Sequence, residues 1–297
     1  MDGEIQVLRL YEEIIRQHPQ FTSDQVDEEL VKQVYTPKRQ ARLEGAFRWA
    51  QNRITRFIER QSTQVFSTEQ KKVLKDRVNR ILFQLPPPAS VYADEPDLFT
   101  KTDIYYERVL DGTLRLRVGG AYLYTVKSWF NMVFTFAHEI AHAIDPCEMK
   151  SIQTNFTAYD RLTSCFIQNQ IMPARKPGQE CGESDQLSET FADWMAAQVV
   201  GEALTKFATE FDRTQLLHSV INSVRDLCEQ DESLRESDNT VHPSPEIRIE
   251  KIFGQSPVVR KVLGCDPAVP EPSAQKTDHG SYCNLEPMQL EKGKTAP

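Results

Sequence analysis

Apolar residues recur at helical spacing through residues 5–84. Between Ile5 and Ile15 they follow a period close to that of an amphipathic helix rather than the alternation of a strand. The sequence Ser67-Thr68-Glu69-Gln70 is typical of a helix start, and the prolines at 86–88 end any helix that reaches them. We expect helices at about 5–15, 41–60 and 68–85. Residues 1–88 are predicted to form an N-terminal helical segment that packs on or caps a second domain, residues 89–297.

After the prolines the apolar positions alternate. Residues 104–110 and 113–118 predict two strands joined by Asp111-Gly112, a dipeptide typical of tight hairpins. In the second strand three aliphatic residues alternate with Arg115 and Arg117, so we expect one face of this strand to be exposed. Residues 128–144 are apolar nearly all round, which predicts a helix buried inside the domain.

The remainder of the chain predicts less regular structure. We expect a loop-rich stretch from Asp145 to about residue 184, helices to about residue 229, and a short helix near 246–253. The end of the chain is rich in Pro, Lys, Glu and Ser and predicts an irregular tail. The predicted fold class is therefore α+β, mainly α-helical, with a small sheet.

Composition excludes several classes of function. The 297 residues are 39% hydrophobic and 26% charged, as in folded globular proteins. The net charge of −8 argues against nucleic acid as a partner, because the phosphate backbone attracts basic surfaces. No stretch approaches the roughly 20 apolar residues that a transmembrane segment needs. The first residues lack the basic and apolar pattern of a signal peptide.

The cysteines all lie in the second half of the chain. None belongs to a Cys-x-x-Cys pair, so a structural zinc knuckle is not indicated. Two interpretations stay open: reduced core thiols in a cytoplasmic protein, or disulfides in an extracytoplasmic one. The six positions are Cys147, Cys165, Cys181, Cys228, Cys265 and Cys283.

The buried helix carries the sequence His138-Glu139-Ile140-Ala141-His142. Residues four apart share a helix face, so both imidazoles can bind one metal ion while Glu139 lies beside them. The alternative is a pair of hydrogen-bonded core histidines, but burying these polar residues on an apolar helix is costly without a partner such as a metal. We predict a catalytic Zn²⁺ site, which needs one more protein ligand and an open position for water.

Glu189 is the best candidate for the third ligand. Because Glu189 and Asp193 are four residues apart, one carboxylate can bind the metal while the other accepts the outer N–H of a ligand histidine. Asp145, three residues after His142, could orient a histidine in the same way. An exposed acidic stripe is the alternative, but the flanking apolar residues, which include Trp194, predict a buried helix.

These motifs resemble the neprilysin and endothelin-converting-enzyme family of gluzincin zinc metallopeptidases. The resemblance rests on HExxH, an Asp three residues later, and the downstream sequence Glu-x-x-Ala-Asp. It implies a thermolysin-like catalytic domain that binds one Zn²⁺. The residues it implicates are the zinc ligands His138, His142 and Glu189, the general base Glu139, and the orienting carboxylates Asp193 and Asp145.

A downstream segment adds to the resemblance. His242 is followed six residues later by Arg248 in a segment that contains two prolines, as in that family. The resemblance implies that His242 helps to stabilise an oxyanion and that Arg248 binds a substrate carbonyl; without it, His242 would be interpreted as a surface histidine. Cys265 and Cys283 are similar to the family's disulfide-bonded C-terminal cysteines, which favours an extracytoplasmic, secreted or periplasmic, location.

The sequence thus predicts a zinc metallopeptidase, in particular an endopeptidase acting on peptide or protein substrates through a zinc-bound water activated by Glu139. We expect the substrate to add as an extended strand to the edge of residues 113–118. A gluzincin aminopeptidase and a non-catalytic binding or scaffold protein on a metallopeptidase fold are the alternatives. Residues 1–85 are too few for the family's enclosing helical lobe, so we expect a more open cleft.

Overall fold

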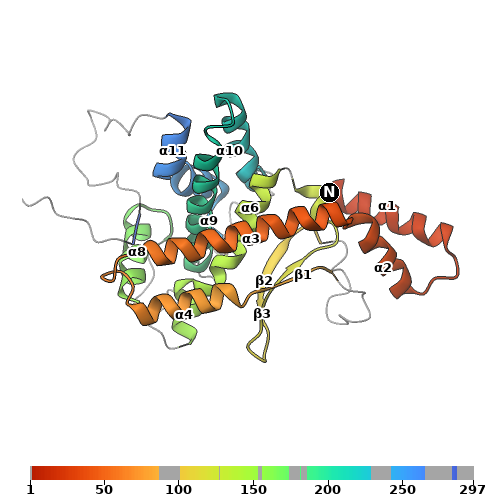
Figure 1. Cartoon of the computed structure of the whole chain (residues 1–297), viewed down its shortest axis with the longest axis horizontal. Coiled ribbons are helices and arrows are strands. Elements are labelled where there is room, and N and C mark those ends of the chain that lie inside the picture. Colours follow the sequence, from red (N-terminus) through yellow and green to blue (C-terminus); the bar gives the residue numbers. More distant parts are fainter. Residues whose placement is uncertain are drawn as a thin grey trace, which may run out of the picture.

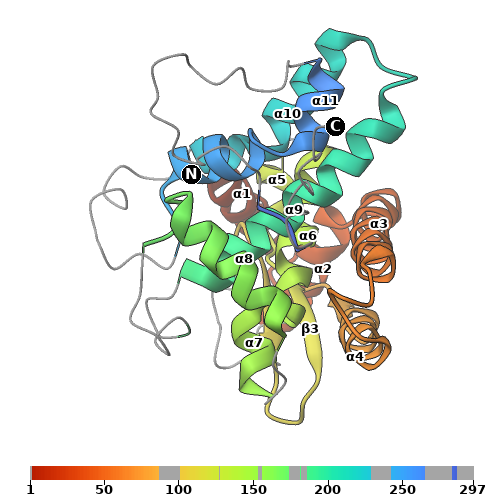
Figure 2. The ribbon, with the colours of Figure 1, turned by 90° about the vertical axis from the view of Figure 1, so that its left-hand side faces the viewer.

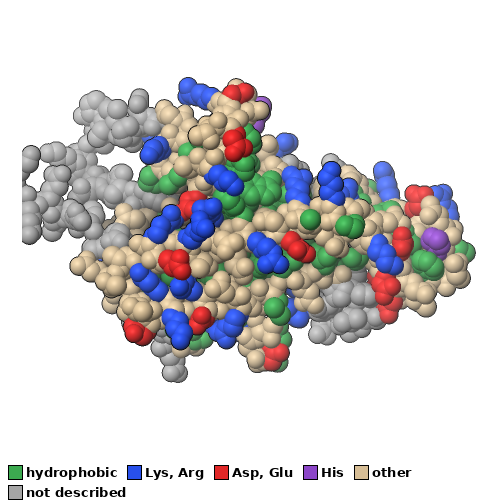
Figure 3. All heavy atoms as spheres, viewed as in Figure 1, with side chains coloured by type: hydrophobic (Ala, Val, Ile, Leu, Met, Phe, Trp, Pro, Cys, Tyr) green, Lys and Arg blue, Asp and Glu red, His purple; other side chains and the backbone are tan. Residues whose placement is uncertain are grey.

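Four helices form the N-terminal part of the molecule (Figure 1). The computed structural model describes residues 2–86, 101–126, 128–152, 156–173, 181, 186–228, 242–264 and 283–285. The helices are α1 (Asp2–Gln17), α2 (Ser23–Val34), α3 (Pro37–Arg60) and α4 (Thr68–Asn79). The helices predicted at 5–15 and 41–60 are confirmed with slightly wider bounds. Over the face in Figure 3, acidic and basic side chains are interspersed along α3 and α4.

The start of α4 follows from its sequence, whereas its end does not. Ser67 and Gln70 form a capping box in which each side chain accepts a hydrogen bond from the other residue's backbone N–H. The helix ends at Asn79, so the prediction that it continues to residue 85 is wrong. Leu82–Gln84 instead forms strand β1, because a neighbouring strand satisfies its backbone hydrogen bonds.

The three strands form one sheet in the order β1-β3-β2. The predicted hairpin is confirmed: β2 (Ile104–Arg108) is antiparallel to β3 (Leu114–Val118), while β1 is parallel to β3. The expectation of an exposed face on the second strand is wrong, since Arg117 is only 9% exposed. The Nε atoms of Arg117 and Arg115 each lie 2.7 Å from a carboxylate oxygen of Glu107 on β2. These ion pairs shield the polar face of the strand from solvent.

Helix α6 (Trp129–Ala141) runs through the middle of the molecule. It packs against α3 on one side and against α9 (Gln186–Phe207) on another, as Figure 2 shows. Phe136 of α6 contacts Phe47 of α3 and Phe83 of β1, with ring centroids 5.8 and 5.7 Å apart. The N-terminal segment therefore shares one hydrophobic core with the rest of the chain. Within the described residues, no helix is long and apolar enough to cross a membrane.

The region after α6 is more helical than its sequence predicts. The turn η2 (His142–Ile144) leads into α7 (Pro146–Ser151) and α8 (Thr157–Gln168), so the expected loop-rich stretch is wrong for these residues. The start of α7 has ordinary signals: the Asp145 carboxylate accepts hydrogen bonds from the N–H groups of Cys147 and Glu148, and Pro146 occupies the first position.

Among the described residues, two disulfides join segments that are distant in sequence. Cys147 bonds to Cys181 and Cys165 bonds to Cys283, with Cα–Cα distances of 5.3 and 5.7 Å. The pairing of Cys283 with Cys265 that the family resemblance implied is therefore wrong, and Cys265 lies outside the described residues. The indole N–H of Trp194 donates to the Cys283 carbonyl at 2.8 Å, so this part of the tail also contacts α9.

The last described helices pack against α9. They are α10 (Arg213–Cys228), the π-helix η4 (Ile247–Phe253) and α11 (Pro257–Leu263). The helix predicted near 246–253 is confirmed, whereas α11 was not expected. Most of the predicted irregular tail, the last thirty residues, lies outside the described residues. With α5 (Tyr122–Thr125), the helices and the three-stranded sheet confirm an α+β, mainly α-helical fold.

Candidate metal centre

The two histidines of HExxH lie at the C-terminal end of α6 and at the start of η2. Helical spacing brings them together, so that their Nε2 atoms lie 3.3 Å apart. His138 is buried, with 6% of its surface exposed, because apolar residues surround α6 on nearly every side. Two imidazoles thus present ring nitrogens to one small volume.

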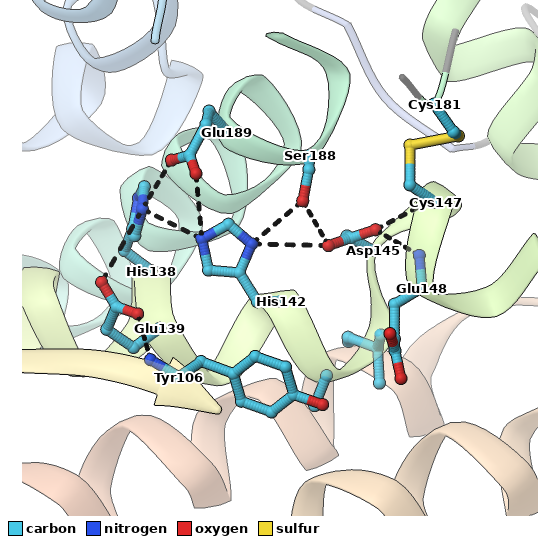
Figure 4. Close-up of polar contacts among 12 residues, drawn as sticks. Tyr106, His138, Glu139, His142, Asp145, Cys147, Glu148, Cys181, Ser188 and Glu189 are labelled. Carbon is cyan, nitrogen blue, oxygen red and sulfur yellow. Dashed lines mark hydrogen bonds and ion pairs between the residues drawn. A yellow bond between two sulfur atoms is a disulfide. The ribbon is translucent and has the colours of Figure 1, made fainter. Parts of the chain in front are cut away.

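Glu189, near the N-terminal end of α9, points into the same volume (Figure 4). Its carboxylate oxygens lie 3.1 Å from Nε2 of His138 and 3.6 Å from Nε2 of His142. One ligand atom from each of the three residues lies within 4.8 Å of the other two. The structure therefore brings together the three predicted ligands as a group that could hold a metal ion.

The donor set and its surroundings fit zinc. Two imidazole nitrogens and one carboxylate are a ligand set of catalytic zinc sites, which leave a fourth position open. The group also lines a pocket of about 630 Å³, which gives that position access from solvent. The other residues that line the pocket are Tyr105, Tyr106, Glu139, Asp145, Cys147, Glu148, Cys181, Ser188 and His242.

Asp193, one helical turn beyond Glu189, orients His138. Its Oδ1 lies 2.9 Å from Nδ1 of His138, so the opposite ring nitrogen faces the metal position. Arg248 on η4 donates to the same carboxylate from Nε and Nη2, at 2.6 and 2.9 Å. Burial alone raises the pKa of Asp193, but the charge of Arg248 and the bond to His138 hold it below its usual value.

The charges around His138 determine its protonation when no metal is bound. Burial lowers its pKa, but hydrogen bonds to Asp193 and Glu189 outweigh this effect and raise the pKa from 6.5 to about 10. The pKa of Glu189 is raised by burial but lowered more strongly by its bonds to His138 and His242. In the metal-free protein a proton on His138 therefore occupies the place where a metal would bind.

His142 has a different set of partners, one of which the sequence analysis missed. Its Nδ1 lies 3.4 Å from Oδ2 of Asp145 and only 3.1 Å from the hydroxyl oxygen of Ser188. That hydroxyl in turn contacts Asp145. Asp145 is thus next to His142, as expected, but Ser188 is the closer partner. The only indication of this contact in the sequence was that Ser188 directly precedes Glu189.

Glu139 lies beside the ligands and is held by the sheet. Its Oε2 accepts a hydrogen bond from the backbone N–H of Tyr106 at 2.7 Å, while Oε1 lies 4.0 Å from Nε2 of His138. Burial raises the pKa of Glu139 and outweighs the opposing charges of the two histidines. A carboxylate of this kind accepts a proton more readily near neutral pH than an ordinary Glu.

Strand β2, not β3, faces the site. The carbonyl of Asp103 accepts from Gly119 N–H and the N–H of Val109 donates to Thr113, both at 2.9 Å, so odd-numbered residues bond to β3. Tyr106 therefore directs its N–H to the open edge of β2, where Glu139 lies. Because β3 has a strand on each side, the prediction that substrate pairs with residues 113–118 is wrong.

Of the two downstream residues, His242 lines the pocket, whereas Arg248 is connected to the site through Asp193. Nε2 of His242 lies 2.9 Å from Oε2 of Glu189, and 45% of the His242 side chain is exposed, so the ring stands at the pocket mouth. Arg248 is 4% exposed and has two nitrogens on Asp193. Its Nη1 is buried without a hydrogen-bond partner among the described residues. A role in binding substrate stays a prediction for both.

Comparisons with known proteins identified no relative of this chain. No protein-family model, no curated protein and no solved structure matches the chain.

Proposed function

We propose that the protein is a zinc-dependent metallopeptidase of the gluzincin type, with a thermolysin-like catalytic domain similar to that of the neprilysin family. One observation carries the proposal: His138, His142 and Glu189 converge at one point while the partly buried Glu139 lies directly beside them. A site that only stores or transports metal has no need of a general base. We further propose that the two disulfides reflect an extracytoplasmic location.

Each residue of the site has its own role in the proposed peptide hydrolysis. A Zn²⁺ ion at the three ligands supplies Lewis acidity, which lowers the pKa of water and polarises a carbonyl. Glu139 accepts the proton of the attacking water at Oε1, because Oε2 is held by Tyr106, and returns this proton to the departing amine. His242, at the pocket mouth, donates to the oxyanion that forms on the carbonyl oxygen. Arg248 holds Asp193, and through it His138, because two of its nitrogens bind that buried carboxylate.

The Glu139→Gln variant tests the proposal. Glutamine keeps the size of the side chain and can still accept from Tyr106, but it cannot take a proton, so hydrolysis of a mixed peptide library should fall at least about 100-fold. Zinc content, measured by mass spectrometry, should stay at one ion per chain. The matched control is Glu59→Gln, which makes the same change at an exposed carboxylate of α3 that is not among the residues lining the pocket, and it should retain activity.

The same library separates the alternatives. Cleavage inside the peptides identifies an endopeptidase, and release of N-terminal residues alone identifies an aminopeptidase. If the wild-type protein binds zinc and cleaves nothing, the peptidase proposal fails and a binding protein on this fold is the better explanation. Undiminished cleavage by Glu139→Gln would refute the mechanism.

A further inference from the structure

The two histidines of the candidate metal site have different hydrogen-bond partners at Nδ1. His138 meets a carboxylate directly, at 2.9 Å from Asp193, and Arg248 holds that carboxylate in place. Asp145, the corresponding carboxylate for His142, lies 3.4 Å from Nδ1, beyond a good hydrogen bond. The Ser188 hydroxyl lies beside both groups: it is 3.1 Å from Nδ1 of His142 and also contacts Oδ2 of Asp145 (Figure 4).

From this geometry we infer that Ser188 is a positioning residue for the metal site, which links His142 to Asp145 and sets the tautomer of His142. The inference deepens the proposed function and rests on it only in that the three ligands bind a metal ion. Ser188 acts through His142, because its hydroxyl lies at Nδ1, the ring nitrogen opposite the Nε2 that faces the other ligands.

The direction of the hydrogen bonds follows from the chemistry of the groups. An ionised carboxylate can only accept, so the Ser188 hydroxyl proton points to Oδ2 of Asp145. The lone pairs of the hydroxyl oxygen are then left for the N–H at Nδ1 of His142. A proton fixed on Nδ1 leaves Nε2 with the lone pair that a metal requires.

Both ends of this arrangement are anchored. The other oxygen of Asp145 accepts two backbone N–H groups at the start of α7, from Cys147 and Glu148, each at 2.7 Å. At the opposite end, Ser188 directly precedes Glu189 on α9. The hydroxyl therefore ties the helix that supplies the third ligand to the turn that supplies the second one. A shift of α9 would disturb both ligands together.

The test compares side chains of equal shape at position 188. Ser188→Thr retains the hydroxyl, whereas Ser188→Val has the shape of threonine without it, and Ser188→Ala gives the simple deletion. Zn²⁺ affinity, measured by competition with a chelator of known affinity, should fall about 10- to 100-fold in the Val and Ala variants. The Thr variant should stay within about threefold of the wild type, since its hydroxyl can bond in the same way.

A control on the same helix separates positioning from general loss of packing. Thr190 is fully buried, and its hydroxyl has no hydrogen-bond partner among the described residues. Thr190→Val removes a hydroxyl two positions from Ser188 without touching His142, so metal affinity should not change. Co²⁺-loaded samples give a second readout: the visible absorption of the site should change in Ser188→Val and not in Thr190→Val.

Three results would overturn the inference. Equal metal affinity and equal Co²⁺ spectra for Ser188→Thr and Ser188→Val would show that the hydroxyl is not used. An equal loss of affinity in both variants would assign the effect to shape. A wild-type protein that binds no metal would remove this inference together with the proposed function, whereas zinc binding without peptide cleavage would remove the peptidase proposal alone.

Discussion

The pKa values of single residues around the metal position depend on burial and on one or two close partners. Burial raises the pKa of Glu139. The pKa of Glu189, a short distance away, is lowered because its hydrogen bonds to His138 and His242 outweigh burial. The two carboxylates thereby differ in their affinity for a proton, which suits the proposed roles of Glu139 as proton acceptor and Glu189 as ligand. The sequence predicted these roles but not the difference in environment.

The pKa of His138 predicts how metal affinity depends on pH. Zn²⁺ and a proton compete for Nε2, and the pKa is raised from 6.5 to about 10 in the metal-free protein. Apparent affinity for Zn²⁺ should therefore keep rising above pH 6.5, by about tenfold per pH unit for each proton released, and level off only near the raised value.

This pH dependence can be measured by chelator competition, with correction for the protonation of the chelator. Calorimetry in buffers of different ionisation enthalpy counts the protons released. An affinity that is already constant above pH 6.5 would contradict the raised pKa of His138.

At the scale of elements, the N-terminal helices contribute directly to the site. Arg77 on α4 is 8% exposed and donates from Nε to the carbonyl of Ala143, the residue after His142, at 2.5 Å. Its Nη2 contacts the Glu148 carboxylate on α7. Helix α4 therefore holds the turn η2, which α9 also contacts. No pattern in residues 68–79 indicates this contact, since Arg77 belongs to a run of charged residues typical of an exposed face.

The two arginines on Glu148 should differ in their effect on stability. Arg77→Met leaves the Glu148 carboxylate without its buried partner, and we expect a loss of about 3–5 kcal/mol in the free energy of unfolding. Arg108 contacts the same carboxylate at 3.0 Å but is 44% exposed, so Arg108→Met should cost about 1 kcal/mol or less. Urea unfolding of both variants measures the difference. Similar losses would show that burial is not the deciding factor.

At the scale of the whole molecule, two disulfides restrain the segments around the pocket. Cys147–Cys181 spans 34 residues, and Cys181 lines the pocket, while Cys165–Cys283 spans 118 residues and attaches the tail to α8. Cross-links that close longer loops restrict the unfolded chain more strongly. The second disulfide should therefore contribute more to stability than the first.

Replacing each pair of cysteines by alanines tests this ranking. Loop-closure entropy predicts losses of about 4 kcal/mol for the Cys147–Cys181 pair and about 5 kcal/mol for the Cys165–Cys283 pair. Denaturant unfolding under non-reducing conditions gives both values. The ranking is wrong if removal of Cys165–Cys283 costs less than removal of Cys147–Cys181.

The sequence alone determined those features that depend on neighbours along the chain. Helical spacing places His138 and His142 on one face, and places Asp193 one turn after Glu189, whatever the rest of the fold does. The hairpin follows from Asp111-Gly112 between two alternating segments in the same way. The resemblance to a known family then indicated that distant residues such as His242 belong beside them.

Tertiary structure decided which of these local pieces meet. The strand β1, the contact of Ser188 with His142, and the Cys165–Cys283 bond each join residues far apart in the chain. Arg248 carries no local sign that two of its nitrogens bind Asp193. Spacing cannot specify such pairs, because hydrogen bonds and disulfides depend on distances that only the packing of α6, α9 and the sheet establishes.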